Sequence, residues 1–283
     1  MLPNFIIGGA PKCGTTSLAI TLSHHKDIFI PSIKEVGFFN NDENWKKGLD
    51  WYKSFFEENS PLIGDATPHY ISSAQGIERI KSTIPDIKII YIIRNPIKRA
   101  HSHFWFRKRG GIEHRTFIEA LKDELETPDN PKNYLIREGC YSLQIKKLLK
   151  HFQGDQLLFF VLEDFKENSK SELEKVYNFL NVEVEETEMS LKNQAVVPKS
   201  KIYQNILLDF TKGNSLVKKM LKNILGRSVR KLLFRKAKQF NNRVKEKPNI
   251  TEEEFDLLKS IYSEEVNALK VYFNRDFSDW LIR

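Results

Sequence analysis

The chain has 283 residues, of which 40% are hydrophobic and 29% are charged, and its 45 Lys and Arg against 37 Asp and Glu give a net charge of +8. This composition excludes a disordered chain and a collagen. It also excludes a disulfide scaffold, because the two cysteines, Cys13 and Cys140, form at most one bridge. A cytoplasmic protein in a reducing compartment is predicted, since we find neither a signal peptide nor an apolar run long enough to span a membrane.

Short apolar runs alternate with amphipathic segments along most of the chain. Continuous apolar runs are typical of strands that are buried on both faces. Their alternation with helical patterns predicts an α/β fold in which helices flank a central parallel sheet. The expected strands are residues 5–7, 62–65, 87–93 and 157–162.

Helix starts are marked by hydroxyl residues, by Pro96 in a first turn and by a capping box at Thr251 and Glu254. We find no sharp domain boundary along the chain. We therefore expect one domain over 1–283, with an α/β core over 1–195 and a basic helical C-terminal extension over 196–283. The expected helices are 15–22, one from Pro96, 142–152, 172–180 and 251–273.

The positive charge is concentrated in one segment. Residues 199–247 hold 15 basic and two acidic residues, a charge of +13, and the rest of the chain carries −5. Within it, 215–240 predicts two basic amphipathic helices, for which a solvated cationic face is the plainest interpretation. Attraction of an anionic polysaccharide and peripheral docking on an anionic membrane are the functional alternatives. Nucleic acid ranks lower, because the aromatic residues there are not interleaved as platforms for base stacking.

The segment Gly8 to Ser17 (GGAPKCGTTS) lies between the first expected strand and helix. Such a loop directs backbone N–H groups and a helix N-terminus at one point. This arrangement favours a phosphate-binding loop over an ordinary turn between strand and helix. Gly9 and Gly14 have the spacing of the nucleotide triphosphatase loop. Thr15 stands where that loop has its lysine, and the lysine of this chain, Lys12, lies inside the loop instead.

The displaced lysine and a second departure argue against a metal-dependent triphosphatase or kinase, and the close histidine pair does not favour a metal site. The strand 87–93 is followed by Arg94 rather than by a magnesium-binding Asp. His101 and His103 are two residues apart, and such residues do not face each other on a helix. We expect no metal site, and we expect the loop to bind a 5′-phosphate with a cation beside the leaving group.

Several motifs in order identify a resemblance that covers nearly the whole chain. The chain resembles the sulfotransferases that use 3′-phosphoadenosine 5′-phosphosulfate (PAPS), and within them the heparan-sulfate sulfotransferase type and its bacterial relatives. The resemblance implies a P-loop-like fold and a nucleotide-binding transferase. The matching segments are 11–18, 34–39, 48–52, 65–70, 93–102, 163–165, 196–201 and 274–280.

The resemblance assigns the cofactor-binding residues. Lys12 would stabilise charge on the leaving oxygen. Arg94 and Ser102 would bind the 3′-phosphate, for which the planar guanidinium is suited. Lys199 and Lys201 would close over the same side. The residues implied for the 5′-phosphate are Gly14, Thr15, Thr16 and Ser17.

The resemblance also assigns Glu35 as the general base that takes the proton of the acceptor. The family often has Lys at the position of Ala66, where this chain has no cation, so that Lys34, His69 or no group compensates. The implied reaction is in-line transfer of a sulfuryl group from PAPS to a hydroxyl or amine of a carbohydrate or glycoconjugate. The alternatives are a nucleotide kinase or triphosphatase with a degenerate loop, and a non-catalytic membrane- or polyanion-binding protein.

Overall fold

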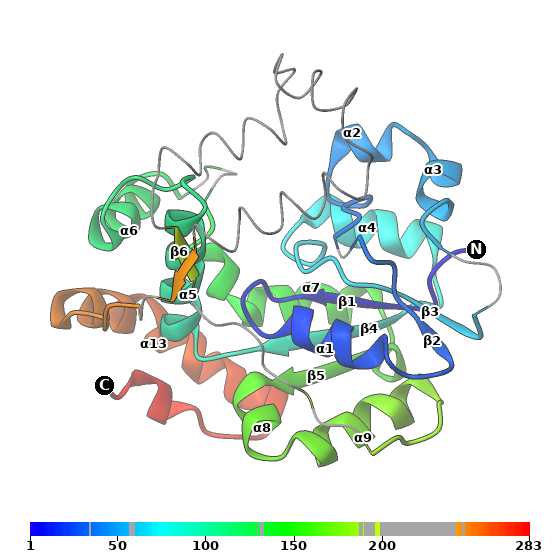
Figure 1. The fold of residues 1–283 in the computed structure, drawn as a ribbon. Coiled ribbons are helices and arrows are strands. Elements are labelled where there is room, and N and C mark those ends of the chain that lie inside the picture. Colours follow the sequence, from blue (N-terminus) through cyan, green and yellow to red (C-terminus); the bar gives the residue numbers. More distant parts are fainter. Residues whose placement is uncertain are drawn as a thin grey trace.

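A five-stranded parallel sheet forms the centre of the fold (Figure 1). The strand order is β2-β3-β1-β4-β5, and every pairing is parallel. This confirms the predicted central parallel sheet. The strands are β1 (Phe5–Gly9), β2 (Ile28–Phe29), β3 (Leu62–Asp65), β4 (Lys88–Ile93) and β5 (Leu157–Val161).

The computed structural model describes residues 1–33, 35–56, 60–128, 130, 133–186, 189, 196–198, 242–244 and 247–283. Lys34, Lys199, Lys201 and the segment 215–240 lie outside the described residues. The predictions made for them are therefore not addressed by the structure.

Helices cover both faces of the sheet. In Figure 1, α1 lies on one face, and α4 and α7 lie on the other, as right-handed crossovers in opposite directions require. The helices are α1 (Thr15–Leu22), α2 (Asp42–Trp45), α3 (Leu49–Lys53), α4 (Ala74–Thr83), α5 (Pro96–Arg109), α6 (Phe117–Glu126), α7 (Tyr141–His151), α8 (Leu162–Glu167), α9 (Ser169–Leu180) and α13 (Glu252–Phe273). Short 3₁₀ turns are η1 (Arg137–Gly139), η2 (Gly154–Gln156) and η3 (Ser278–Leu281).

The order of the strands places a ligand site at one edge of the sheet. The chain moves outward from β1 to β2, returns through β3 and then crosses to β4 on the other side of β1. Such a change of direction opens a crevice at the carboxyl ends of the strands. The loop after β1 and the residue after β4, Arg94, both lie at this edge.

The capping signals of the sequence are confirmed. The Asn95 side chain accepts a hydrogen bond from the Lys98 N–H at 3.0 Å, and Pro96 occupies the first turn of α5. Thr251 and Glu254 form the predicted capping box of α13. Several expected boundaries differ from the observed ones by one to three residues. Leu162, for example, begins α8 instead of ending β5, because the chain turns into a helix directly after the strand.

The C-terminal helix is part of the packed core. Helix α13 packs against α5 and α7 (Figure 1) and buries Leu258, Val266 and Leu269. The Tyr262 hydroxyl donates to the carbonyls of Leu135 and Ile136, both at 2.9 Å. Two short strands that the sequence analysis did not predict, β6 (Val196–Pro198) and β7 (Asn242–Val244), pair antiparallel. The division of the chain at residue 195 stays a prediction.

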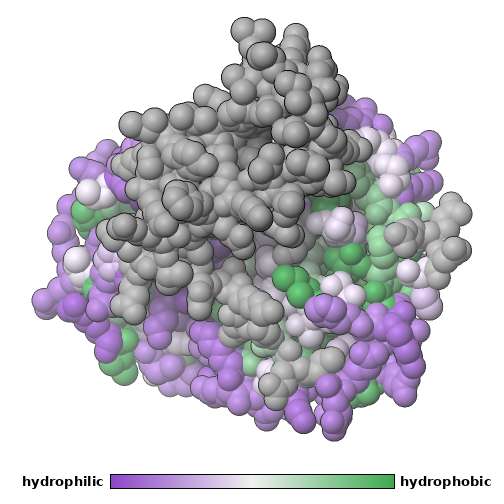
Figure 2. Space-filling model, viewed as in Figure 1, coloured by the Kyte–Doolittle hydropathy of each residue, from purple (hydrophilic) through white to green (hydrophobic). Residues whose placement is uncertain are grey.

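The described surface is mainly hydrophilic in the view of Figure 2, where hydrophobic residues gather toward the side of the N-terminus. Among the described helices, none has the length and apolar character that crossing a membrane requires.

Candidate active site

The loop between β1 and α1 has a backbone that depends on glycine. Gly14 has a φ of +89°, and a Cβ at this position would lie 2.6 Å from Leu162 Cδ1. Both the left-handed conformation and the close approach of α8 therefore exclude a side chain. Gly14 is also the N-cap of α1, and no described side chain caps this helix. The N-terminal N–H groups of α1 are thus oriented toward a site that suits an anion.

The predicted phosphate-binding residues lie together at this helix start. Thr15, Thr16 and Ser17 form the first turn of α1. Arg94 follows β4, the neighbour of β1, and its Nη1 donates to the Lys12 carbonyl at 3.3 Å. The Nε atom of Arg94 is buried and has no hydrogen-bond partner among the described residues. Arg94 therefore connects the loop to the sheet, and its Nε–H remains available to donate to a ligand.

Cations from distant parts of the chain converge on this loop. Lys247 donates from its Nζ to the hydroxyl of Ser102 at 3.5 Å. The Lys12 Nζ lies 4.0 Å from the ring centroid of Phe106 on α5. None of the ion pairs found among the described residues includes Lys12, Arg94 or Lys247.

The two lysines of this group have lowered pKa values. Burial, followed by the charges of Arg109 and Arg94, lowers the pKa of Lys12 to about 8. Burial and the charges of Arg94, Arg109 and Lys12 lower the pKa of Lys247 to about 8. Since these groups repel one another, an anionic ligand at this point would stabilise all of them. We call Lys12, Arg94, Arg109 and Lys247 the cation cluster.

Glu35 lies close enough to Lys12 and His69 to act on both. Its residue is exposed, and its carboxylate is near enough to raise the pKa of Lys12, against the larger effects of burial and the arginines, and to raise that of His69. The structure thus brings the predicted base and the predicted leaving-group cation into one site.

His69 is the titratable group that the structure adds beside Glu35. Its Nδ1 lies 3.5 Å from Glu138 Oε1, a carboxylate that is almost wholly buried. Burial lowers the pKa of His69, but Glu138 and Glu35 outweigh it, so that the pKa lies above its ordinary value. Ala66 is buried. His69 is therefore the described candidate for the cation that Ala66 does not supply.

Sequence reasoning missed Lys247 and Arg109. Lys247 was counted only as part of the basic segment, and its contact with Ser102 depends on the path of the chain. Arg109 belongs to the last turn of α5, where three basic residues follow one another. Arg109 lies at the other end of α5 from Arg94, so no local pattern indicated either Arg109 or Lys247.

A pocket of about 490 Å³ adjoins the cation cluster between α5 and the segment that precedes α13. It shares Lys247 with the cluster. Its other basic lining residues are Lys98, His101 and Arg283.

The two histidines of α5 have structural partners. His101 accepts from Trp105 Nε1 at 2.8 Å, and His103 lies 3.3 Å from Arg99 Nη1. No group of His, Cys, Asp and Glu among the described residues could hold a metal ion. Cys13 is a free thiol, and burial raises its pKa to about 11, which keeps it protonated.

The comparisons with known proteins agree on one family. The family model described as "Sulfotransferase domain" matches residues 2–270. A "Membrane-associated sulfotransferase kil1" from Dictyostelium discoideum is 39% identical over 110 residues, which are 37% of this chain and 23% of the relative. A "Bifunctional heparan sulfate N-deacetylase/N-sulfotransferase 1" from Xenopus laevis is 30% identical over 197 residues, which are 64% of this chain. The matched region is only 22% of that relative's length.

Solved structures show the same fold. A sulfotransferase from Alicyclobacillus acidocaldarius has a TM-score of 0.71 and 22% identity, with 99% of both chains covered. The mouse sulfotransferase SULT7A1 complexed with PAP has a TM-score of 0.51 and 17% identity, and 99% of this chain and 88% of that chain are covered. The predicted resemblance and the predicted enzyme class are confirmed at the level of the family. With its family match over 2–270 and the fold of known members, the chain belongs to the sulfotransferases.

Proposed function

We propose that this protein transfers a sulfuryl group from PAPS to a hydroxyl or amine of a carbohydrate or glycoconjugate. The observation that carries the proposal is the cation cluster at the uncapped start of α1. PAPS carries phosphate groups at the 3′ and 5′ positions of its ribose, and the cluster gathers several cations near the loop. The Nε of Arg94, which has no hydrogen-bond partner among the described residues, fits such a ligand.

Each residue has a distinct part in this reaction. The N–H groups and hydroxyls from Gly14 to Ser17 bind the 5′-phosphate. Arg94 and Ser102 bind the 3′-phosphate, and Lys247 joins them through its contact with Ser102. Lys199 and Lys201 stay predicted ligands of the same phosphate. PAPS supplies a sulfuryl group whose transfer leaves negative charge on the departing phosphate oxygen.

Lys12 stabilises that charge, because its ammonium group lies inside the loop that holds the phosphate. Glu35 takes the proton of the attacking hydroxyl or amine. Transfer is in line and uses no metal ion in this proposal. The names of the relatives that act on heparan sulfate favour a glycan with free amino groups as acceptor. A cytoplasmic location, with contact to a membrane through residues 215–240, stays a prediction.

The test incubates the protein with PAPS and a panel of glycans, lipids and phenols, including N-deacetylated heparan sulfate. We expect one glycan to gain the mass of a sulfate group, with and without EDTA, and a strongly reduced gain in the same time with the Lys12→Ala variant. No gain on any glycan, with transfer to a phenol instead, would contradict the proposed acceptor class. Hydrolysis of ATP with magnesium would favour the kinase or triphosphatase alternative. Salt-sensitive binding to membranes or polyanions that does not depend on Lys12 or Glu35 would favour the non-catalytic binding alternative.

A further inference from the structure

The segment that carries Glu35 is held in place by side chains rather than by regular structure. Residues 35–38 belong to no helix or strand. Glu35 is exposed, whereas Val36 and Phe38 are buried. The Asn44 side chain of α2 donates to the carbonyls of Val36 and Gly37 at 3.2 and 3.1 Å. The position of the predicted base is therefore set by what binds this short segment.

The N–H groups of the segment are bound from the end of β3. The Gly37 N–H donates to Thr67 Oγ1 at 3.4 Å, and the Phe38 N–H donates to the Tyr70 hydroxyl at 3.0 Å. Gly37 has a φ of +66°, which directs its peptide groups to these partners.

Both of these hydroxyls donate in turn to one carboxylate. Thr67 Oγ1 donates to Asp65 Oδ1 at 2.7 Å, and Tyr70 donates to Asp65 Oδ2 at 2.7 Å. Asp65 is completely buried at the end of β3. A buried carboxylate costs free energy unless hydrogen bonds satisfy it, and here three hydroxyls do, since Tyr52 also donates to Oδ2 at 2.8 Å.

We propose that Asp65 is a positioning residue, which through Tyr70 and Thr67 fixes the N–H groups of Gly37 and Phe38 and so fixes Glu35 against the sulfuryl donor. The inference rests on the proposed function, in which Glu35 is the base. Asp65 sits on the rigid sheet, so the two hydrogen-bond chains transmit the position of β3 to a segment without regular structure. A base that is displaced by about 1 Å loses roughly 10- to 100-fold in rate.

Two tyrosines provide a matched pair of variants. Tyr70→Phe and Tyr52→Phe each remove one hydroxyl from Asp65 Oδ2, and both residues are fully buried. Only Tyr70 also binds the Phe38 N–H. The rings stay in both variants, so the stacking of Tyr52 on Phe38 at 4.5 Å and the edge contact of Tyr70 with Phe39 at 5.2 Å are kept.

We expect Tyr70→Phe to lower kcat by roughly tenfold or more, with the panel glycan that gives the highest rate, and Tyr52→Phe to lower it by less than about threefold. Both variants should bind PAP like the wild type, and Tyr70→Phe should lose somewhat more Tm, because it also gives up the bond to the Phe38 N–H. Amide exchange of Phe38 should become a few-fold to about tenfold faster in Tyr70→Phe alone, since one net hydrogen bond is lost.

Equal kcat values in the two variants, or unchanged amide exchange at Phe38 in Tyr70→Phe, would overturn the positioning role. Glu35→Gln separates this failure from that of the proposed function. Wild-type turnover in Glu35→Gln would contradict the assignment of Glu35 as the base, and the positioning role of Asp65 would fail with it. Loss of turnover in Glu35→Gln, together with wild-type turnover in Tyr70→Phe, overturns the positioning role alone.

Discussion

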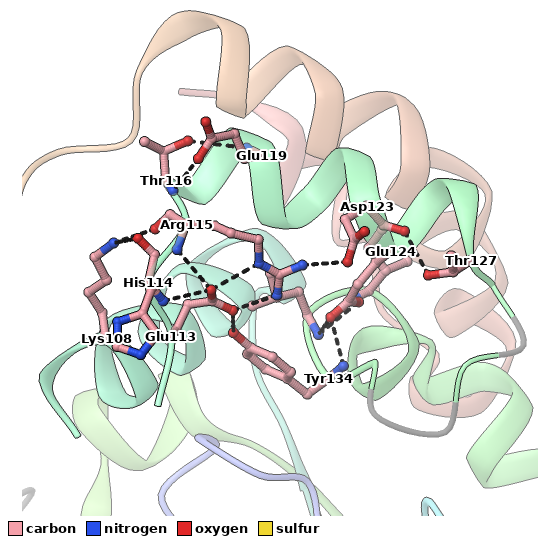
Figure 3. Close-up of polar contacts among 12 residues, drawn as sticks. Lys108, Glu113, His114, Arg115, Thr116, Glu119, Asp123, Glu124, Thr127 and Tyr134 are labelled. Carbon is pink, nitrogen blue, oxygen red and sulfur yellow. Dashed lines mark hydrogen bonds and ion pairs between the residues drawn. The ribbon is translucent and has the colours of Figure 1, made fainter. Parts of the chain in front are cut away.

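Helix α5 contacts two charged regions that are built in opposite ways. The first is the cation cluster, which includes Arg94 before the helix and Arg109 in its last turn, and in which burial and the neighbouring positive charges lower the pKa values of the lysines. Just beyond the end of the helix lies a paired network around Glu113 and Arg115, which Figure 3 shows with the side chains turned toward one another.

The paired network is satisfied within the protein. Glu113 accepts from the N–H groups of His114 and Arg115 and from the Arg115 guanidinium at 2.6 to 3.0 Å. The Tyr134 hydroxyl adds a fourth donor group at 2.8 Å, and Arg115 also contacts Asp123. These bonds, that of Arg115 first, lower the pKa of Glu113 to about 2.

The difference separates a ligand site from a structural one. In the network each charge has an opposite charge beside it, so both pKa values move away from neutrality, downward for Glu113 and upward for Arg115. In the cation cluster burial first, and then the neighbouring positive charges, lower the pKa values of the lysines, which means that desolvation and repulsion there are both unfavourable in the folded chain. Such repulsion is relieved by an anionic ligand and is typical of functional sites.

The largest expected effect comes from Lys12→Ala. Turnover should fall by about 100- to 1000-fold, because the charge on the leaving oxygen loses its nearest cation. The matched control is Lys108→Ala, which removes a lysine from the paired network, where Lys108 donates to the carbonyl of His114 at 2.7 Å. The control should lower Tm and keep kcat. Comparable losses of kcat in both variants would contradict the division between the two regions.

The affinity for PAP should depend on pH through Lys12 and Lys247. Both have a pKa of about 8 in the free protein, and a bound phosphate favours their charged forms. Binding therefore takes up protons above about pH 8, and the affinity falls as the pH rises, by up to about tenfold per pH unit for each lysine. Titration calorimetry from pH 7 to about 9.5 measures this fall.

Lys247→Gln should weaken PAP binding by about tenfold at neutral pH and make the pH dependence shallower, because one of the two protons is no longer taken up. Lys259→Gln removes the same charge from the exposed side of α13 and serves as control. A pH profile that is unchanged in Lys247→Gln would exclude Lys247 from the phosphate site.

Glu113→Gln should reduce the free energy of unfolding by about 1–3 kcal/mol and leave PAP affinity unchanged, because it removes a buried acceptor of charged donors. The folded pKa of Glu113 is depressed, so its stabilisation is present above about pH 4.5 and is lost as the pH falls through about 2. Urea titrations of both proteins should therefore converge between these pH values. A constant difference down to pH 2 would show that the charge of Glu113 is not what stabilises the network.

The fold was predictable where one segment carries its own signal. The strands β1, β3, β4 and β5 are continuous apolar runs, and the loop residues from Lys12 to Ser17 are contiguous, so local patterns sufficed. Strand β2 has two residues and helices α2 and α3 have four and five, too short for any periodicity. Helix α6 could have been found, because Thr116 and Glu119 form a capping box.

The site was predictable only in part, for the same reason. Arg94 and Ser102 are joined by one helix start, and the segment 65–70 matched a family motif. The contact of Lys247 with Ser102 and the bonds from Asp65 toward Gly37 are tertiary. They join segments whose distance apart in space no local pattern encodes. The roles of the predicted residues stay predictions until turnover is measured.

The smallest expected effect concerns an exposed ion pair, which tests whether pairing or burial gives the Glu113 network its stability. Lys122 on α6 lies 3.1 Å from Glu253 at the start of α13, and both side chains are more than half exposed. Lys122→Gln should cost no more than about 0.5 kcal/mol, and high salt should remove the difference, because solvent and ions screen such a pair. Urea titrations at low and high salt measure this. A loss equal to that of Glu113→Gln would mean that pairing alone stabilises these contacts, and the burial of Glu113 would then not explain the contrast with the cation cluster.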